Sequence, residues 1–463
     1  MQQPAAGLPA VPDAVSRSRF PHPIVLLVGC VILAAVLTWV VPAGAFDRAP
    51  DAATGREVVV AGTFHRVDPA PVGPFGALVA IPRGMADAAE VIFLVFLVGG
   101  GFMVVEATGA LGPLVAALAR RLARRELLVI PVCSLAFGLG GILIQMQEEL
   151  VAFAPVLLLL SRRMGLDRVT AVAMSIGAAV IGAAFSPIDP FLVGIAQQVA
   201  GVPLLSGAGF RIAVLVPALG LWIAGTMRYA ARHRPAPEVV EEEAAGAAAA
   251  GWRQGTVLAL VLAAFTLFIV GVMRWGWGFN EMSAVFFVMG AAAGIVAGLG
   301  LGGTAEAFVA GFRSMTYAAV LIGFARAIFV VLGDGRIVDS IVQGLFTPLA
   351  GVPVAVSALG MMVAHALLHF PVPSTSGHAV LTMPILAPLA DLLGMSRQVA
   401  ILAYQYGAGI VDVVNPTNGA LLAMVAALGV PFDRWLRFAL PLAGLLLGLG
   451  GAAILAALAL GLT

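Results

Sequence analysis

Pro371-Val-Pro-Ser-Thr-Ser-Gly-His378 is a polar, helix-breaking island inside strongly apolar sequence, and Asp412-Val-Val-Asn-Pro-Thr-Asn-Gly419 is a second one. Irregular backbone at membrane depth is tolerated only where protein or a water-filled cavity shelters it. Two such islands within residues 370–431 therefore predict a binding site inside a helical membrane protein.

The composition supports the membrane class. The chain has 463 residues, of which 61% are hydrophobic and 11% charged, and its mean hydropathy is +1.04. Apolar runs of spanning length recur along it, which is typical of a polytopic all-α membrane protein and excludes a soluble domain. A net charge of +1 argues against a nucleic-acid partner, and two cysteines exclude a disulfide framework.

The first half of the chain predicts a helical hairpin that does not cross the membrane. Leu127–Leu160 is flanked by arginines at both ends, so a simple span would leave one cluster on the wrong side. We expect a re-entrant hairpin with its tip at Gln145–Glu149. The next segment, 167–200, is too long for one helix and contains Ser186-Pro-Ile-Asp-Pro190, whose prolines predict a broken helix.

The rest of the chain is expected to form ordinary helices and a second hairpin. The N-terminus is expected in the cytoplasm, because arginines flank the first apolar run, and the C-terminus outside. The chain is expected to begin with a tail (1–22), a helix (23–46), an external loop (47–83) with a small hairpin at 56–67, and a helix at 89–111. Further helices are expected at 210–229, 256–273, 282–301 and 317–332, with a cytoplasmic connector that carries Glu306 and Arg313 before the last of them. The chain then continues with an external segment (333–350), a second re-entrant hairpin (352–393), a second broken helix (398–428) and a final helix (435–460).

The two halves resemble each other. A single offset aligns Pro155 with Pro384 and Ser186-Pro187 with Asn415-Pro416, and it places the first hairpin tip on Ser374–His378. An odd number of spans between the copies makes the repeats inverted in topology. Inverted repeats with paired broken helices are typical of secondary transporters whose site lies at the midplane.

Several motifs carry a family resemblance. Pro373-Ser-Thr-Ser-Gly-His-Ala379, Met383-Pro-Ile-Leu-Ala-Pro-Leu-Ala-Asp391 and Tyr404-Gln-Tyr-Gly407, together with Glu148-Glu149, resemble the YfcC family of transporters. That family is grouped with DcuC-type C4-dicarboxylate carriers in the ion transporter superfamily. The resemblance covers nearly the whole chain and implies a homodimer in which a scaffold holds a mobile transport domain that moves like an elevator.

The resemblance also implies where this chain differs from related carriers. Those carriers use a Ser-Asn-Thr signature at each hairpin tip, whereas here the tips read Ser374-Thr-Ser376 and Gln145-Met-Gln-Glu-Glu149. The expected units are a cytoplasmic tail (1–22), first scaffold helices (23–126), half of the transport domain (127–234), a cytoplasmic linker (235–253), second scaffold helices (254–350) and the other half of the transport domain (351–463).

The candidate site residues come from the two tips and the two breaks. Hydroxyls at a helix N-terminus suit a carboxylate, and amides and carbonyls freed at a break suit Na⁺ or a polar solute. The alternative is that these residues only cap the helix ends, and both roles are compatible. The candidates are Gln145, Gln147, Glu148, Glu149, Ser186, Asp189, Ser374, Thr375, Ser376, Gly377, His378, Asp412, Asn415, Thr417 and Asn418, with candidate Na⁺ positions at 186–189 and 415–418.

Adjacent carboxylates at membrane depth give the sharpest indication of chemistry. Glu148 and Glu149 would hardly both stay ionised without a cation, so they predict an ion, proton or cationic-substrate site. The alternative is that they are solvated in a wet vestibule. Arg326 could pair with Glu106, bind a carboxylate or extend to the headgroups. His365 and His369 have a metal-like spacing, but Ala366 stands where a zinc protease needs Glu, so that enzyme is discounted.

These patterns predict a secondary active transporter of the bacterial inner membrane and not an enzyme. Its expected solute is small and carries a carboxylate, most simply an amino acid, for which a basic side chain is left open, with Na⁺ or H⁺ as the coupling ion or with exchange, and with no other cofactor. A C4-dicarboxylate carrier is the main alternative, and a Na⁺/H⁺ antiporter is a second. An intramembrane hydrolase would need a group that orients Ser374 and His378, and the sequence shows none.

Overall fold

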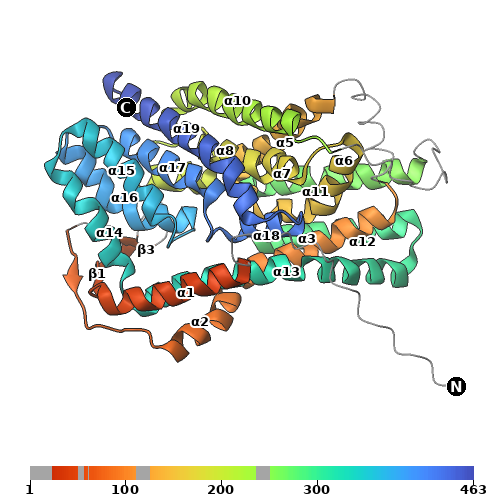
Figure 1. Ribbon diagram of the computed structural model, residues 1–463, viewed down its shortest axis with the longest axis horizontal. Helices are drawn as coiled ribbons and strands as arrows, with labels where there is room; N and C mark the ends of the chain where they lie inside the picture. The colour runs from red at the N-terminus through yellow and green to blue at the C-terminus, as the bar shows by residue number, and fades with distance from the viewer. Residues whose placement is uncertain (1–22, 51–56, 61, 111–125, 236–250, 463) are drawn as a thin grey trace.

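The computed structural model describes residues 23–50, 57–60, 62–110, 126–235 and 251–462. Most of these residues are helical (Figure 1). Five of the described helices are long and apolar enough to cross a membrane, or six if a bent pair within residues 300–334 counts as one span. The chain is therefore a multi-pass membrane protein. The predicted N-terminal tail, the Arg120–Arg125 cluster and most of the linker lie outside the described residues.

One group of helices packs around α13, which lies along the lower side of the molecule in Figure 1. Small residues let these helices approach closely, since a Cβ placed on Gly84 of α2 would lie 2.5 Å from the backbone nitrogen of Ala327 on α13. The group consists of α1 (Pro23–Val40), α2 (Pro74–Asp87), α3 (Ala89–Ala107), α11 (Trp252–Trp275), α12 (Phe279–Ala297) and α13 (Gly300–Asp334).

A second group fills the rest of the molecule and contains both predicted hairpins and both predicted broken helices. It consists of η1 (Glu126–Leu128), α5 (Val129–Ile144), η2 (Glu148–Phe153), α6 (Ala154–Met164), α7 (Arg168–Val172), η3 (Ala173–Gly177), α8 (Ala178–Ala184), η4 (Pro190–Gly194), α9 (Ile195–Val199), α10 (Ala208–Arg232), α14 (Val338–Phe346), η5 (Thr347–Gly351), α15 (Val354–Leu368), α16 (Thr375–Leu392), α17 (Arg397–Val411), η6 (Asp412–Val414), α18 (Gly419–Ala427) and α19 (Phe432–Ala459).

The same pair of elements packs together in each half of this group. The first arm of each helix–loop–helix segment lies against the helix that precedes a break, so α5 packs on α8 and α15 packs on α17. The contact between α5 and α8 is so close that a Cβ on Gly141 would lie 2.0 Å from the carbonyl oxygen of Ala179. Helix α13 meets α18, and this contact joins the two groups.

Both breaks fall where the prolines predict them. Helix α8 ends at Ala184 and helical structure resumes at Pro190, while η6 ends at Val414 and α18 begins at Gly419. Proline lacks a backbone N–H and clashes with the preceding turn, so Pro187 and Pro416 favour the end of a helix at these positions.

The segment after the first helix differs from the prediction. Helix α1 ends at Val40 instead of Phe46, and the expected loop 47–83 contains a helix, since Pro74 starts α2. Its small hairpin is also differently paired: β2 (Arg48–Pro50) pairs with β3 (Glu57–Val59), and β1 (Gly44–Ala45) with β4 (His65–Arg66). Pro82 lies inside α2, and this proline made the segment read as a loop.

The predicted connector with Glu306 and Arg313 is wrong. Both residues lie within α13, which spans 35 residues and includes the bend between Tyr317 and Ala319. Their side chains are exposed, so a charged outer helix face was mistaken for a loop. The turn before α13 is formed instead by Gly298, whose φ of +88° ends α12.

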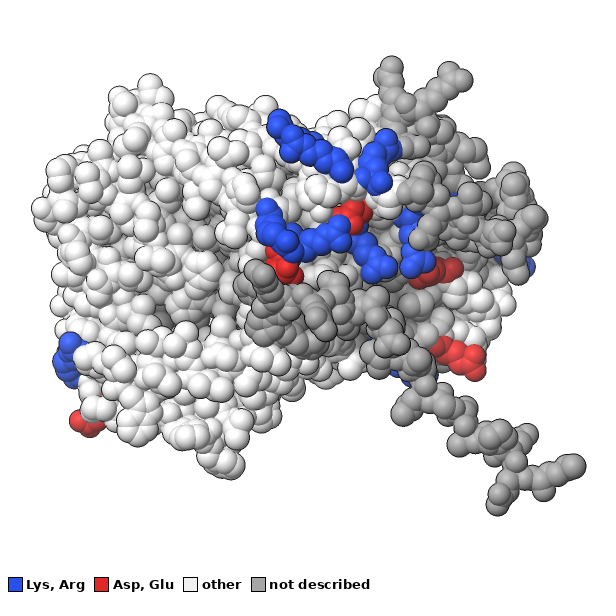
Figure 2. All heavy atoms as spheres, viewed as in Figure 1, with Lys and Arg blue, Asp and Glu red and all other residues white. Residues whose placement is uncertain are grey.

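Charge gathers at one end of the molecule. Figure 2 shows arginines over the right half of the visible face, while most of the left half is uncharged. The last turn of α6 carries Arg162 and Arg163, and Arg434 of α19 lies 3.3 Å from Asp167, just before α7. These helix ends therefore share one side of the molecule.

Candidate functional site

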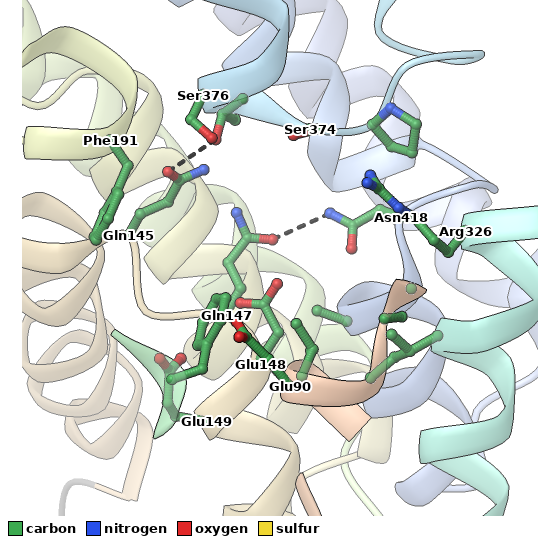
Figure 3. A pocket seen from close by; sticks show the side chains of 18 of the residues that line it. Glu90, Gln145, Gln147, Glu148, Glu149, Phe191, Arg326, Ser374, Ser376 and Asn418 are labelled. Carbon is green, nitrogen blue, oxygen red and sulfur yellow. Dashed lines mark hydrogen bonds between the residues drawn. The ribbon is translucent and has the colours of Figure 1, made fainter. Parts of the chain in front are cut away.

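A cavity of about 460 Å³ lies where the two helix groups meet. The first group contributes the junction of α2 and α3 together with parts of α11, α12 and α13. The second group contributes both tips and the second break. Figure 3 shows Gln145 of the first tip beside Ser376 and Gln147 directed at Asn418, with Glu148 and Glu149 below them.

The first tip is anchored on the second break. Helix α5 ends at Ile144, and Gln145 takes the left-handed conformation, with φ at 53°, that turns the chain. The Gln147 amide then bridges two residues across the cavity: its Nε2 donates to Asp412 Oδ2 over 3.2 Å, and its Oε1 accepts from Asn418 Nδ2 over 3.1 Å. The first half of the sequence thus completes a site begun by the second.

The second tip touches the first. Thr375 Oγ1 donates to Gln145 Oε1 over 3.0 Å. Ser374 is the N-cap of α16, and its Oγ accepts from the backbone N–H of Gly377 over 3.4 Å. The helix begins at Thr375, so the predicted tip 371–378 is too long: Gly377 and His378 belong to the helix.

An acidic wall closes one side of the cavity. Glu148, Glu149 and Asp412 all line it, and Figure 3 shows both glutamates on the same side as Glu90. Glu149 is 4% exposed, and its Oε2 has no hydrogen-bond partner among the described residues. A buried, ionised carboxylate without a hydrogen-bond partner raises the free energy of the folded protein, so a cation or a proton would be stabilised at this oxygen.

The second break supplies amide and hydroxyl groups with two functions. Asn415 Oδ1 accepts from Thr417 Oγ1 over 2.7 Å, and Asn415 Nδ2 donates to the His369 carbonyl over 3.0 Å. Asn418 caps α18, because its Oδ1 accepts from the Leu421 N–H over 2.9 Å. Thr417 and Asn418 nevertheless line the cavity, whereas Asn415 is buried beneath it.

The first break lies away from the cavity. Ser186 and Asp189 are both 0% exposed and do not line it. Ser186 Oγ donates to the Ile142 carbonyl over 2.6 Å, and Asp189 Oδ1 accepts from the backbone N–H groups of Phe191 and Leu192. Asp189 Oδ2 has no partner in the part of the chain that the structure describes. The two breaks are therefore not equivalent.

Ten of the fifteen candidate residues line the cavity. The five that do not are Ser186, Asp189, Gly377, His378 and Asn415. Within the described ranges, no three His, Cys, Asp or Glu side chains are arranged to hold a metal ion. The candidate Na⁺ positions at 186–189 and 415–418 remain predictions.

Sequence reasoning missed the first helix group's share of the site. Arg326 of α13 pairs with Asp87 at the end of α2, not with Glu106, and both residues line the cavity. Glu90 and Trp277 line it as well. A charged residue inside an apolar helix was the available signal for Arg326, but its partner is 239 positions away and no local pattern reveals it.

A second cavity of about 590 Å³ lies on the other side of the second tip. Arg326, Phe329 and Ser374 line both cavities. The second cavity is also lined by Arg48 and Arg336, and by Asp339, which pairs with Arg48 at 3.0 Å. The two cavities therefore adjoin at Ser374 of the second tip and at Arg326 and Phe329 of α13.

Known proteins resemble this chain along its whole length. The model of the DcuC family, C4-dicarboxylate anaerobic carrier, matches residues 20–459. The chain belongs to the DcuC family. YfcC of Escherichia coli (strain K12), named as a proposed basic amino acid antiporter, is 33% identical over 96% of this DcuC-family chain and 97% of its own length. An uncharacterized protein of Haemophilus influenzae is 30% identical over 95% of this chain and 97% of its own.

Two solved transporters also match this member of the DcuC family. The crystal structure of the Alcanivorax borkumensis YdaH transporter covers 95% of this chain and 99% of its own, with 20% identity and a TM-score of 0.47. Neisseria gonorrhoeae MtrF, described with a class of antimetabolite efflux pumps, covers 94% of this chain and 95% of its own, with 18% identity and a TM-score of 0.42. The family and its relatives make this chain a transporter.

Proposed function

We propose that this DcuC-family chain is a secondary active transporter for an amino acid with a basic side chain, driven by Na⁺, by H⁺ or by exchange. The observation that carries the proposal is the charge balance of the first cavity. Its lining includes five carboxylates, namely Asp87, Glu90, Glu148, Glu149 and Asp412, against the single guanidinium of Arg326. Such an excess attracts a solute with more than one positive group.

The positions of the polar groups favour a solute with charges of both signs. Ser374, Thr375 and Ser376 stand at the N-terminus of α16, where backbone N–H groups and the helix dipole favour a carboxylate. Arg326 lies on the same cavity wall as Phe329 and adds a cation. The acidic wall at Glu148 and Glu149 suits an amino group. A basic amino acid fits both sides.

The fold supports an elevator-like movement. In this proposal the group around α13 is the scaffold, and the tips and breaks form the transport domain, built from two inverted repeats with re-entrant hairpins. A homodimer would hold the scaffold in place. The arginine-rich end would face the cytoplasm of a bacterium, which places β1–β4 and α14 outside.

A C4-dicarboxylate is the second candidate, and the description of the family model favours it. A dicarboxylate would add two negative charges to a cavity already lined by five carboxylates. Transport of such a solute would therefore require protons or cations on Glu148, Glu149 or Asp412. The two candidates thus give opposite roles to the same side chains.

Counterflow in proteoliposomes tests the proposal. We expect labelled arginine or ornithine to exchange and succinate to compete poorly. The double variant Glu148→Gln with Glu149→Gln removes two charge-assisted contacts, so apparent affinity should fall by at least about tenfold. The matched control is Glu306→Gln, an exposed residue on α13.

Two results would contradict the assignment. Exchange of a basic amino acid that is indifferent to the double variant would remove the glutamates from the site. Competition by succinate but not by arginine or ornithine would replace the amino acid with a dicarboxylate.

A further inference from the structure

Three of the six histidines meet in one buried cluster behind the second tip. His365 lies on α15, His369 directly follows the end of that helix and His378 lies on α16, and each is 0% exposed. Asp412 of η6 completes the cluster. The sequence placed His365 and His369 one turn apart but gave no reason to join them to His378 or Asp412.

The four side chains form an unbroken series of contacts at hydrogen-bond distance. His369 Nε2 lies 3.0 Å from Asp412 Oδ1, His369 Nδ1 lies 3.3 Å from His378 Nδ1, and His378 Nε2 lies 2.8 Å from His365 Nδ1. Every ring nitrogen but one thus has a partner. The exception is His365 Nε2, which is buried and has no partner among the described residues.

A proton count shows what this series can hold. Three protons, on His365 Nε2, His378 Nε2 and His369 Nδ1, make the three rings neutral and leave His369 Nε2 facing the Asp412 carboxylate without a proton. A fourth proton fills this last contact. On Asp412 it leaves all four groups neutral, and on His369 it makes one imidazolium beside one carboxylate, from which shifts within the other contacts carry the positive charge toward His365. The four loaded groups have no net charge, so the site holds the proton without a net buried charge.

The series has a single opening. Asp412 lines the first cavity, and its Oδ2 accepts from Gln147, which also lines that cavity. The far end is closed: the ring centroid of His365 lies 4.9 Å from that of Phe346 and 5.3 Å from that of Tyr404. A proton between Asp412 and His369 can therefore exchange only with the cavity, to which Asp412 belongs.

We propose that the series Asp412–His369–His378–His365 is a binding site for one coupling proton, loaded from and released to the water of the substrate cavity. The inference rests on the proposed transport function and names its coupling ion. A closed far end is what a carrier requires, because a chain open at both ends would conduct protons without moving solute. Gln147 connects the site to the solute, since it contacts both Asp412 and Asn418.

Other titratable groups surround the series on several elements. Glu148 of η2 lines the cavity beside Asp412, and Tyr404 of α17 packs its ring on His365 and His378 while its hydroxyl donates to the Thr375 carbonyl. Asp189 before η4 lies within electrostatic range of Tyr404. On α14, Asp339 is already paired with Arg48. The experiment must therefore separate the histidines from these carboxylates.

Proteoliposomes with a pH gradient and no Na⁺ gradient provide the test. The variant is His369→Gln, which can still bond Asp412 but cannot carry a proton from one side to the other. The control is His233→Gln, an exposed histidine at the end of α10. We expect His369→Gln to lose accumulation driven by the pH gradient and to keep counterflow at equal pH, while His233→Gln behaves like the wild type.

Three outcomes would overturn the inference without refuting the proposed transport function. In the first, His369→Gln accumulates solute as well as the wild type does. In the second, accumulation by the wild type follows the Na⁺ gradient and ignores the pH gradient. In the third, a folded His369→Gln variant loses both counterflow and accumulation. Absence of counterflow for every amino acid and dicarboxylate in the wild type would instead refute the proposed function.

A measurement on the wild type keeps the inference testable if the variant fails to fold. Imidazole ¹⁵N NMR of the histidine-labelled protein follows each ring during a pH titration. We expect the signals of His365, His369 and His378 to change together, because they share one proton, whereas exposed His65 and His233 change singly. Signals of the three buried rings that stay constant, or that change independently, would overturn the shared site.

Discussion

At the scale of single residues, Gln147 joins the first tip to the second break. Its amide joins Asp412, which begins the histidine series, to Asn418, which caps α18. A neutral amide can donate to a carboxylate through its nitrogen and accept from a second amide through its oxygen at the same time. Its position therefore transmits a change on Asp412 to the wall of the cavity.

Replacing Gln147 with alanine should lower both stability and transport. The substitution leaves Asp412 Oδ2 and Asn418 Nδ2 without partners in a buried site, at a cost of about 1–3 kcal/mol. A thermal-shift assay in detergent and counterflow in liposomes measure the two effects. Gln343→Ala on α14, away from the cavity lining, is the control and should change neither. A Gln147→Ala protein as stable and active as the control would contradict this role.

The sequence could predict which residue types reach the site but not how they pair. The tips and the second break were identified because prolines, hydroxyls and amides stand out in apolar sequence. The pairing of Arg326 with Asp87, and of Asp412 with His369, depends on elements far apart in the chain. Ser186 and Asp189 show that a polar residue at a break need not reach the cavity, since their side chains accept hydrogen bonds from the backbone there and do not line it.

At the scale of elements, close contact between α5 and α8 positions the first tip. Gly141 presses against the backbone of α8, so the arm that ends at Gln145 has little freedom to rotate. Small residues at a helix contact are the usual means of such an approach in membranes, where no hydrophobic effect draws helices together. The geometry of the tip is thus set one turn away from the cavity.

Gly141→Ala should therefore loosen this arm. The added Cβ would lie 2.0 Å from the Ala179 carbonyl oxygen, which forces the helices apart and costs about 1–3 kcal/mol. Gly220→Ala on α10 is the matched control, because it is also helical and nothing lies within 4 Å of the added carbon. The melting temperature should fall for Gly141→Ala only. An equal response of the two variants would show that this contact is not tight in the membrane.

The elements themselves were predictable where one signal dominated. Long apolar runs and X-Pro breaks gave the helices of the second group, because local chemistry alone ends those helices. Helix α2 and the strand pairs were not predictable. Pro82 lies inside the helix and disguises it. Gly44 pairs with Arg66, which lies 22 positions further along the chain, so no local pattern reveals this pair. Exposed Glu306 and Arg313 concealed the continuity of α13 in the same way.

At the scale of the whole molecule, the contact of α13 with α18 joins the two helix groups. Gly419 at the start of α18 faces Ile322 of α13, and a Cβ placed on Gly419 would lie 3.4 Å from that of Ile322. A disulfide needs a Cβ separation of about 3.5–4.5 Å, so a cysteine pair at these positions can form one with little adjustment. This pair would fasten one group to the other.

The test variant carries Ile322→Cys with Gly419→Cys, in a chain whose Cys30 and Cys133 are replaced by serine. Oxidation of this cysteine pair should stop transport if the two helix groups slide past each other. The control pair is Met85→Cys with Gly323→Cys, which lies inside the α13 group with a Cβ separation of 3.3 Å. Its oxidation should leave transport unchanged, and reduction should restore the first pair. Transport that persists with the first pair fully cross-linked would exclude sliding at this contact.

The position of Ser374 on both cavities has a kinetic consequence. Ser374 of this loop lines both cavities together with Arg326 and Phe329 of α13, so a displacement of the loop would connect them on its side without moving a helix group. Loops relax in about nanoseconds to microseconds and collective domain motions in about microseconds to milliseconds. Solute would then equilibrate with its site many times for each crossing, so half-saturation of uptake would equal a true dissociation constant.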